Sequence, residues 1–326
     1  MQKVYIILLN WNGERDTCDC IASLLNLEYA QFDIVVCDNA SEKKSVAFIE
    51  AFCIGLLEDK KINGFESIEQ NFLPRHNYHH PKNITLIHTG SNRGFAGGVN
   101  IGLAFAERQG DADYYWILNN DCIVDPQSLS ELVLKFDSAP VTGICGSTLV
   151  YAHDRKTIQA LGGAKYHKCS GASYALGAFQ QLGKSAMSEA EVEANMSYVV
   201  GASMLVRRQL IDVVGLMDER YFLYSEEHDW AYRAVLRGFK LGYASKSVVY
   251  HKHGASIGSD AKGGSPKSLY YLYRSKILFT KKFYPLLVLF VIFNSLFVAL
   301  KFLVKGNLPK GLAIVQAVLI GKRAYD

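Results

Sequence analysis

The residues best suited to chemistry include three oxygen-bearing side chains in a row. Asn119, Asn120 and Asp121 directly follow the apolar segment 114–118. A Mg²⁺ or Mn²⁺ ion that holds a diphosphate needs few protein carboxylates, because phosphate oxygens and waters fill its other coordination positions. Asp121 therefore suffices as the charged metal ligand, and Asn119 adds a weaker neutral one. An Asx turn is the alternative role of this segment.

A second group of acidic residues could act as a general base. Glu226, Glu227 and Asp229 stand close together in the sequence YFLYSEEHDW. Crowding of like charges raises carboxylate pKa values, which suits a group that removes a proton near neutral pH. The same residues also fit the acidic first turn of an amphipathic helix over residues 230–236, and both roles can hold together.

Asp38 is a candidate for recognising a nucleobase. It follows the apolar residues 35–37. A carboxylate there can accept a hydrogen bond from the imide N–H of uracil or thymine. A helix N-cap, aided by Asn39 and Ser41, is the alternative.

Residues 92–100, NRGFAGGVN, place glycines at the start of a predicted helix. Glycine lets the backbone approach a ligand, and a helix N-terminus favours anions. Gly94, Gly97 and Gly98 lack the spacing of the dinucleotide-binding fingerprint, and the segment follows the third predicted strand, so a Rossmann dehydrogenase is disfavoured. A plain glycine-rich turn is the alternative.

Two histidines, His251 and His253, follow the apolar segment 247–249. One of them could complete the metal site. A single histidine is more often structural or solvated, so the pattern leaves both roles open.

Apolar strands alternate with helices through the first 125 residues. Strands are predicted over residues 3–9, 32–37, 84–88 and 114–118, and helices over residues 16–27, 42–54 and 95–109. This alternation predicts an α/β fold with a mostly parallel central sheet flanked by helices. Ligands bind at the carboxyl ends of parallel strands, where the polar clusters at residues 10–13, 38–41, 92–98 and 119–121 all fall.

Two stretches interrupt this alternation. Residues 55–83 are polar and are predicted to form a solvated insertion loop rather than a metal cluster of His76, His79 and His80. Residues 151–197 are glycine-rich and are expected to be irregular, ending in a short acidic helix near residues 189–193.

The composition excludes several protein classes. Hydrophobic residues make up 49% of the chain and charged residues 20%, which excludes global disorder. The seven cysteines form no CxxC pair or finger spacing, which favours reduced thiols in the cytosol over disulfides or zinc fingers. The apolar residues 3–9 are too few for a signal peptide.

Charge is unevenly distributed along the chain. Residues 265–326 contain ten Lys and Arg residues and one acidic residue, a net charge of +9, whereas residues 1–264 hold 25 basic and 30 acidic groups, a net charge of −5. The basic groups flank apolar runs, which favours an anionic membrane surface over nucleic acid as the partner. The uncharged run 286–300 is shorter than the ~20 residues of a straight span. Monotopic or re-entrant insertion is therefore favoured, with a buried core helix as the alternative.

Seven motifs together resemble a known family. They are LNWNG, CDNAS, SNRGFAGGVNIG, ILNND, VVGASMLVRR, FLYSEEHDW and YHKHGAS. Their order and approximate spacing over residues 3–256 resemble family 2 glycosyltransferases, in particular the bacterial rhamnosyltransferase-like branch. The resemblance implies a GT-A fold, a nucleotide-diphospho-sugar donor, Mg²⁺ or Mn²⁺, and inversion at the anomeric carbon.

The resemblance also implies a role for each site residue. Asp121 and His251 match the metal-binding positions, with Asn119 where the family often has Asp. Glu227 matches the catalytic base, and Asp229 or Glu226 could take that role because Glu stands here in place of the usual Asp. Donor binding is expected at Asn10, Asn12, Asp38, Asn39, Asn92, Arg93, Gly94 and Asn120, and acceptor binding at Gly201, Ala202 and Ser203.

The expected organisation follows from these assignments. Residues 1–264 would form the GT-A catalytic domain, with a nucleotide-sugar half over residues 1–125 and an acceptor half over residues 126–264. Residues 265–326 would form a C-terminal hydrophobic helical segment that associates with a membrane.

The expected reaction is transfer of rhamnose or another hexose from a UDP- or dTDP-sugar to a polyprenyl-diphosphate-linked glycan. It would take place at the cytoplasmic face of the cell membrane, during cell-surface polysaccharide synthesis. A non-catalytic nucleotide-sugar-binding scaffold and a nucleotidyltransferase are the alternatives. Residues 10–13 lack the glycine-rich phosphate loop with a Lys that the latter normally carries. The choice of sugar, the linkage and the oligomeric state stay open.

Overall fold

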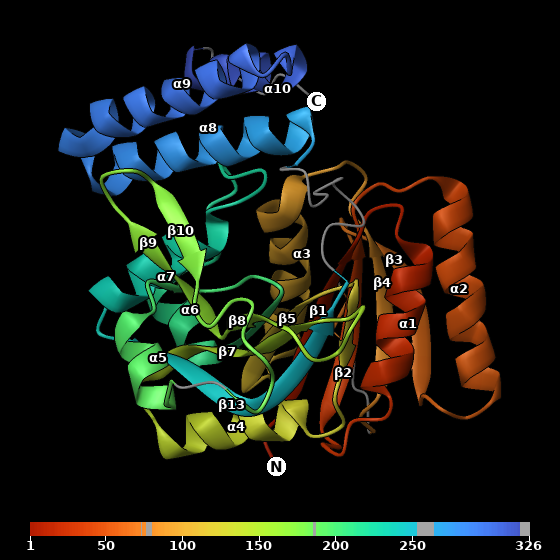
Figure 1. Ribbon diagram of the computed structural model, residues 1–326. Coiled ribbons are helices and arrows are strands. Elements are labelled where there is room, and N and C mark those ends of the chain that lie inside the picture. The colour runs from red at the N-terminus through yellow and green to blue at the C-terminus, as the bar shows by residue number, and fades with distance from the viewer. Residues whose placement is uncertain (73, 76–79, 185–186, 253–263, 320–326) are drawn as a thin grey trace.

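The computed structural model describes residues 1–72, 74–75, 80–184, 187–252 and 264–319. These residues form a ten-stranded sheet and a three-stranded sheet, with helices on both faces of the larger one (Figure 1). The large sheet has the order β3 (Gly64–Glu69), β4 (Asn83–His88), β2 (Phe32–Asp38), β1 (Val4–Asn10), β5 (Tyr114–Asn119), β12 (Ser203–Arg207), β7 (Thr142–Tyr151), β13 (Lys240–His251) and β6 (Cys122–Val124), with β8 (Ile158–Leu161) paired to β7.

The pairing confirms the predicted α/β fold with a mostly parallel sheet. Strands β3, β4, β2, β1 and β5 pair in parallel, as do β7 and β13, whereas β12 and β6 are antiparallel to their neighbours. In register, Asn10 pairs with Asp38, and Leu9 pairs with Asn119. The polar residues that end β1, β2 and β5 therefore lie at one edge of the sheet, where parallel α/β folds bind ligands.

The two faces of the sheet are buried by different helices. Ile6 and Leu8 of β1 pack with α1 (Glu14–Leu24), α2 (Lys43–Glu58) and α4 (Ser128–Ser138). Ile7 points to the opposite face, toward α3 (Gly94–Gln109), α6 (Arg208–Val214) and α7 (Glu226–Leu236). Alternate side chains of a strand point to opposite faces, so a strand that is apolar at every position is buried on both.

Both stretches expected to be irregular contain regular structure. In the stretch 55–83, α2 continues to Glu58 and β3 adds a parallel edge strand to β4, which corrects the predicted loop. His76 and His79 lie outside the described residues. In the stretch 151–197, β8 joins the large sheet, while β9 (Gly163–His167) and β10 (Ala172–Ala175) form the small sheet together with β11 (Tyr198–Val199). The short acidic helix expected near residues 189–193 is α5 (Glu189–Asn195), between β10 and β11 in the chain.

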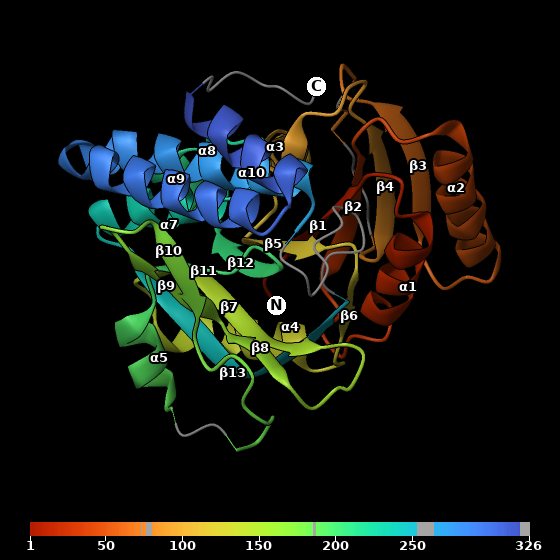
Figure 2. The same ribbon diagram turned by 45° about the horizontal axis from the view of Figure 1, so that its top comes forward.

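Three C-terminal helices form a separate layer (Figures 1 and 2). They are α8 (Pro266–Phe283), α9 (Val288–Val304) and α10 (Leu308–Leu319), with a short 3-10 turn at Pro285–Leu287. Helix α8 packs on the remainder of the molecule: Tyr271 stacks on Phe222 with ring centroids 4.6 Å apart, and the Oγ atom of Ser275 donates to the carbonyl of Leu223. The division expected between residues 264 and 265 thus does not coincide with a break in packing.

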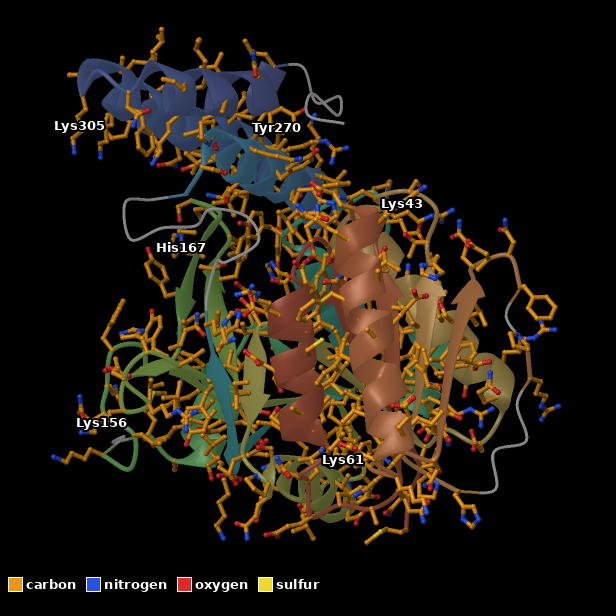
Figure 3. All side chains as sticks on the ribbon, turned by 90° about the vertical axis from the view of Figure 1, so that its right-hand side faces the viewer. Lys43, Lys61, Lys156, His167, Tyr270 and Lys305 are labelled. Carbon is orange, nitrogen blue, oxygen red and sulfur yellow. The ribbon has the colours of Figure 1, made fainter. Side chains whose placement is uncertain are left out.

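Helix α9 has one packed side and one open side. Val291, Ser295 and Ala299 are buried, and Gly311 of α10 allows the close approach, because a Cβ atom there would lie 3.1 Å from the carbonyl oxygen of Ala299. The open side carries large apolar side chains at Leu286, Leu289, Phe290, Phe293, Phe297, Leu300 and Val304. Together with the preceding turn, this helix covers 20 residues and is long and apolar enough to cross a membrane, by length and composition alone. Lys305 lies at an outer end of the layer (Figure 3).

Candidate active site

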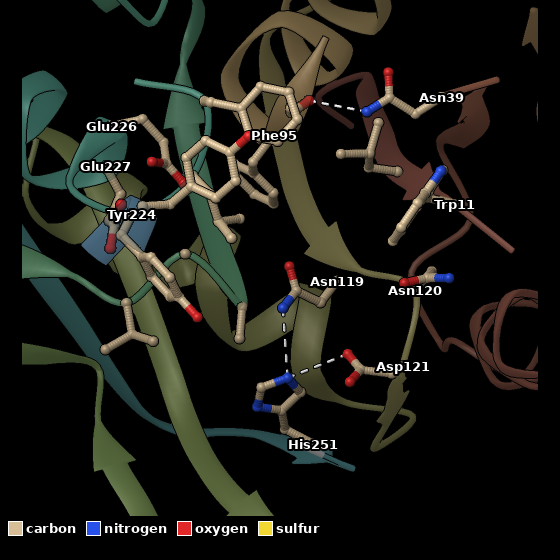
Figure 4. A pocket seen from close by; sticks show the side chains of 18 of the residues that line it. Trp11, Asn39, Phe95, Asn119, Asn120, Asp121, Tyr224, Glu226, Glu227 and His251 are labelled. Atoms are coloured by element: carbon tan, nitrogen blue, oxygen red, sulfur yellow. Dashed lines mark hydrogen bonds and ion pairs between the residues drawn. The ribbon is translucent and has the colours of Figure 1, made fainter. Parts of the chain in front are cut away.

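A pocket of about 500 Å³ lies at the carboxyl-end edge of the sheet, between the strand ends and the start of α7 (Figure 4). Many of the residues singled out in the sequence meet there. Its lining includes Trp11, Asn39, Asn92, Gly94, Phe95, Asn119, Asn120, Asp121, Gln159, Gly201, Ala202, Phe222, Tyr224, Glu226, Glu227, His251, Lys267 and Tyr271.

Asp38 and Asn10 lie behind the pocket wall rather than in its lining. Asn10 Nδ2 donates to Asp38 Oδ1 over 2.8 Å and to Ser41 Oγ over 3.1 Å. The backbone N–H of Ser41 donates to Asp38 Oδ2 over 3.0 Å. The carboxylate is only 2% exposed, and the aromatic face that this corner presents to the pocket belongs to Trp11.

Asn12 holds two loops together. Its backbone has φ +53°, its N–H donates to Ser41 Oγ, and its Oδ1 accepts from the N–H of Glu42 over 2.8 Å. The exposed side chain of Asn12 therefore stabilises the loop that precedes α2, and Asn12 is absent from the described pocket lining.

Asn39 organises the glycine-containing loop. Its Nδ2 donates to Asn92 Oδ1 and to the carbonyl of Gly94, both over 3.0 Å, and its Oδ1 accepts from the N–H of Arg93. Asn39, Asn92 and Gly94 line the pocket, whereas the exposed Arg93 is not in the described lining.

Gly94 brings this loop against the segment that leads into α7. Its φ of +71° lies in the left-handed region, and a Cβ atom there would lie 2.1 Å from the carbonyl oxygen of Phe222. That same oxygen accepts from the N–H of Phe95 over 2.8 Å. Only glycine permits this contact, which joins the loop at the start of α3 to the segment that leads to Glu226 and Glu227.

Asp121 and His251 form a candidate metal centre. The distance from His251 Nε2 to Asp121 Oδ1 is 3.1 Å, and Asn119 Nδ2 lies 3.4 Å from the same ring nitrogen (Figure 4). Gln159 Oε1 lies 2.8 Å from His251 Nδ1, and because a carbonyl oxygen only accepts, Nδ1 carries a proton. With Nδ1 held by Gln159, Nε2 is the ring nitrogen that faces the Asp121 carboxylate, where a shared cation could bind both groups.

Cys122 is close to this pair but does not suit a hard cation. One ligand atom each from Asp121, Cys122 and His251 lie within 4.8 Å of one another. Burial raises the pKa of the Cys122 thiol well above its usual range, and its Sγ faces the carbonyl of Ala202. Mg²⁺ and Mn²⁺ prefer oxygen ligands to sulfur. The other neighbour, Asn120, lines the pocket and donates to Thr17 Oγ1 over 2.9 Å, which ties β5 to α1.

Glu226 and Glu227 point into the pocket from the first turn of α7 (Figure 4). Tyr224 and Ser225 both have φ near +66°, an uncommon turn for non-glycine residues that immediately precedes the two carboxylates. The Oε2 atom of each glutamate is buried without a hydrogen-bond partner among the described residues. Burial raises the pKa of Glu227 to about 7, and burial together with the charge of Glu227 raises that of Glu226 well above its usual range.

Asp229, expected as an alternative base, is not in the described pocket lining. Its side chain is fully buried, with Oδ1 2.6 Å from Arg233 Nε and Oδ2 2.5 Å from Lys282 Nζ. Tyr221 donates to the same Oδ2 over 3.1 Å. Two cations thus hold this carboxylate outside the described pocket lining.

Of the three residues expected to bind the acceptor, two belong to the described pocket lining and one does not. Gly201 and Ala202 line the pocket, and the Cγ atom of Glu227 would lie 3.9 Å from a Cβ atom on Gly201. Ser203, expected at the acceptor site, is not in the described lining. Its Oγ accepts from Trp116 Nε1 over 3.0 Å and lies 2.8 Å from Ser147 Oγ, inside the core.

Several residues of the pocket lining were not predicted from the sequence. Trp11 lies within the polar cluster 10–13, and an aromatic ring among polar residues at a strand end could have indicated a ligand contact. Gln159 lies in the stretch expected to be irregular, and no local pattern connects it to His251. Lys267 and Tyr271 were assigned to the membrane segment because of the basic and aromatic composition around them.

Comparison with known proteins agrees with this geometry. Residues 5–215 match glycosyl transferase family 2. Over 191 residues the chain is 28% identical to the N-acetylglucosaminyl-diphospho-decaprenol L-rhamnosyltransferase of Mycobacterium tuberculosis, a match that covers 55% of this chain and 62% of that relative. The chain thus matches less than two thirds of that protein's length.

Solved structures share the fold at low sequence identity. The GalNAc-T7 complex with UDP, GalNAc and Mn²⁺ has a TM-score of 0.58 at 12% identity, covering 84% of this chain and 47% of that one. The Pyrobaculum calidifontis mannosyltransferase PcManGT, in complex with GDP-Man and Mn²⁺, has a TM-score of 0.56 at 12% identity, covering 99% and 77%. The structure of S. aureus TarS 1–349 has a TM-score of 0.54 at 13% identity, covering 98% of this chain and 81% of that one. The chain therefore belongs to glycosyltransferase family 2, has the GT-A fold and is a glycosyltransferase.

Proposed function

We propose that this enzyme transfers a hexose, rhamnose being the first candidate, from a UDP- or dTDP-sugar to a polyprenyl-diphosphate-linked saccharide, with inversion at the anomeric carbon. The observation that carries the proposal is that one pocket holds both the Asp121–His251 pair and Glu227, whose buried Oε2 has no hydrogen-bond partner among the described residues. The name of the mycobacterial relative supports the sugar and the lipid-linked acceptor.

Asp121 and His251 would hold the divalent cation, with Asn119 beside them and Gln159 fixing the imidazole tautomer. Two structural neighbours were solved with Mn²⁺, which supports Mn²⁺ or Mg²⁺ as the ion. When bound, such an ion offsets negative charge on the diphosphate of the donor.

Glu227 is the proposed base. Its unpartnered Oε2 can accept the proton of an acceptor hydroxyl as that oxygen attacks the anomeric carbon and the bond to the nucleoside diphosphate breaks. Glu226 stands beside it, and repulsion between the two favours one shared proton at neutral pH. Gly201 and Ala202 leave room beside Glu227 for the acceptor sugar.

The donor nucleotide would lie along the opposite side of the pocket. Trp11 offers an aromatic face, and the loop of Asn92 and Gly94 brings backbone to the pocket wall. Asp38 supports this corner through Asn10 and Ser41. A role of Asp38 in base recognition requires that nucleotide binding expose its carboxylate.

The open side of α9 supports membrane association. Its leucines and phenylalanines, with Lys301 and Lys305 at the same end, match an interfacial anchor on an anionic surface. We place this anchor at residues 285–319 rather than 265–326, since α8 packs on the catalytic part. The surface would be the cytoplasmic face of the cell membrane, where lipid-linked glycans are extended.

The test is nucleotide release by the detergent-purified protein from UDP- and dTDP-sugars with Mn²⁺, in the presence and absence of bacterial lipid extract. We expect release to depend on the extract and a labelled sugar to appear in the lipid fraction. Binding of nucleotide sugar without any turnover, with extract present, would favour a non-catalytic scaffold. Formation of a nucleotide sugar from a sugar phosphate would favour a nucleotidyltransferase.

A further inference from the structure

We propose that Lys267, the second residue of α8, binds the diphosphate of the donor nucleotide, so that a helix assigned by sequence to the membrane segment completes the donor site. This inference rests on the function proposed above and adds a specific donor-binding residue to it. It is carried by the placement of Lys267 in the pocket and by the charge balance there.

The pocket is rich in negative charge. Asp121 contributes a carboxylate, and the Glu226–Glu227 pair adds further negative charge even with one proton shared between its members, whereas Lys267 is the one lysine or arginine among the described residues of the lining. A nucleoside diphosphate adds further negative charge, and repulsion between like charges is strong in a partly desolvated site. A cation at Asp121 and His251 offsets only part of it. The ammonium of Lys267 supplies the remaining opposite charge at the pocket wall.

The position of Lys267 favours the donor over the acceptor. Its Nζ lies 5.4 Å from the centroid of the Trp11 ring, within the range of a cation–π contact. Trp11 follows β1 on the nucleotide side, whereas Glu227 and Gly201 mark the acceptor side. The contact with the ring uses none of the three N–H donors in a directed hydrogen bond, so they can reach phosphate oxygens.

The start of α8 is held firmly, which gives Lys267 a defined place. Ser265 caps the helix by accepting from the N–H of Ser268 over 3.1 Å. The hydroxyl of Ser268 lies 2.7 Å from that of Tyr224, which also lines the pocket. Further along, Arg274 Nη1 donates to the carbonyl of Arg220 over 2.9 Å. A side chain presented by an anchored helix loses less entropy when it binds a ligand.

Lys82 offers a matched control. Its Nζ also lies over an aromatic ring, 5.7 Å from the centroid of Phe32, but just before β4 and outside the described pocket lining. A variant at Lys82 therefore removes a lysine and a cation–π contact without touching the proposed site.

The experiment measures binding of uridine, UMP and UDP, and of the thymidine series, to the full-length protein with Mn²⁺. For Lys267→Met, which keeps the aliphatic stem, we expect affinity for the diphosphate to fall about tenfold or more, the scale of a lost hydrogen bond to a charged group. Nucleoside affinity should change less than twofold, Lys267→Arg should recover part of the loss, and Lys82→Met should match the parent. In turnover assays, the donor KM should rise while the acceptor KM stays constant.

Outcomes that contradict the role of Lys267 can be distinguished from outcomes that contradict the proposed function. Equal losses for nucleoside and diphosphate would show that Lys267 only supports Trp11, and a rise confined to the acceptor KM would show that it binds the lipid diphosphate instead. Either result overturns this inference while leaving glycosyl transfer intact. Failure of the parent protein to bind any nucleoside diphosphate would overturn the proposed function and this inference with it.

Discussion

His251 Nε2 lies 3.1 Å from Asp121 Oδ1, although the two residues stand far apart in the chain. Strand pairing produces this contact, because His251 ends β13 and pairs in register with Cys122 of β6, the residue after Asp121. The candidate metal centre is thus formed by the pairing of β6 with β13.

Asp121→Ala should abolish turnover and remove the effect of Mn²⁺ on donor binding, because it deletes the charged ligand. Binding of the nucleotide sugar is to be compared with Mn²⁺ and with EDTA for both proteins. The parent should bind more tightly with Mn²⁺, and the variant should bind equally under both conditions. Near-normal activity of the variant at saturating Mn²⁺ would remove Asp121 from the site.

Gln159→Leu should weaken the apparent affinity for Mn²⁺ by about 10- to 100-fold, since it removes the partner that fixes the tautomer of His251. The readout is the Mn²⁺ concentration that gives half-maximal turnover. Gln181→Leu, in the adjoining loop, serves as a control and should retain the parent value. An unchanged Mn²⁺ requirement in Gln159→Leu would show that the imidazole needs no such partner.

Glu227→Gln should lower kcat by about 100-fold or more while the donor affinity changes by only a few-fold, as expected for loss of a general base. Asp229→Asn serves as the comparison, since its carboxylate is held by Arg233 and Lys282 and should affect stability instead. If Asp229→Asn showed the kinetic loss and Glu227→Gln did not, the base would be misassigned.

The rate should depend on pH through Glu227. Burial raises its pKa to about 7, so the carboxyl is protonated and inactive as a base below that pH. We expect kcat/KM to rise with pH up to about 7 and then to level off. A profile that is flat from pH 5 to 8, measured in one buffer system at constant ionic strength, would contradict this assignment.

The same raised pKa has a consequence for stability. The folded protein keeps a proton on Glu227 that the unfolded chain releases near pH 4.5, so this group favours the folded state at low pH and loses that contribution as the pH rises through about 7. Glu227→Gln should therefore raise Tm relative to the parent at pH 8 and have a smaller effect at pH 4.5. Thermal unfolding at the two pH values provides the measurement.

Phe290→Ser combined with Phe293→Ser should weaken membrane association without loss of folding, because both side chains are more than 60% exposed on the open side of α9. Each buried phenylalanine contributes roughly 1.5–3 kcal/mol that salt does not screen. We expect the parent to stay with membranes through a high-salt wash and to need detergent, and the variant to be released. Free solubility of the parent without detergent would point to an oligomer interface on α9.

Local sequence patterns were enough to predict the α/β fold and the strand ends that carry the polar clusters. Strands such as residues 4–10 and 114–119 are continuous apolar runs, and each ends where asparagine or aspartate stops the pattern. Because parallel strands end at one edge, Asn119 and Asp121 could be placed beside the residues that follow β1 and β2 before any contact was known. The short edge strand β3 was missed, since its half-exposed residues have no apolar run and depend on the free edge of β4.

Tertiary structure alone decided which neighbouring residues face the pocket. Glu227 and Asp229 are two positions apart on α7, a rotation of about 200°, so one points into the pocket and the other into a salt bridge with Lys282. Ser203 begins β12 with its side chain in the core, next to the pocket residues Gly201 and Ala202. Gln159 and Lys267 reach the site from elements distant in the chain, through strand pairing and helix packing. Residue type and spacing identify groups capable of chemistry, but their orientation depends on long-range packing that no local pattern records.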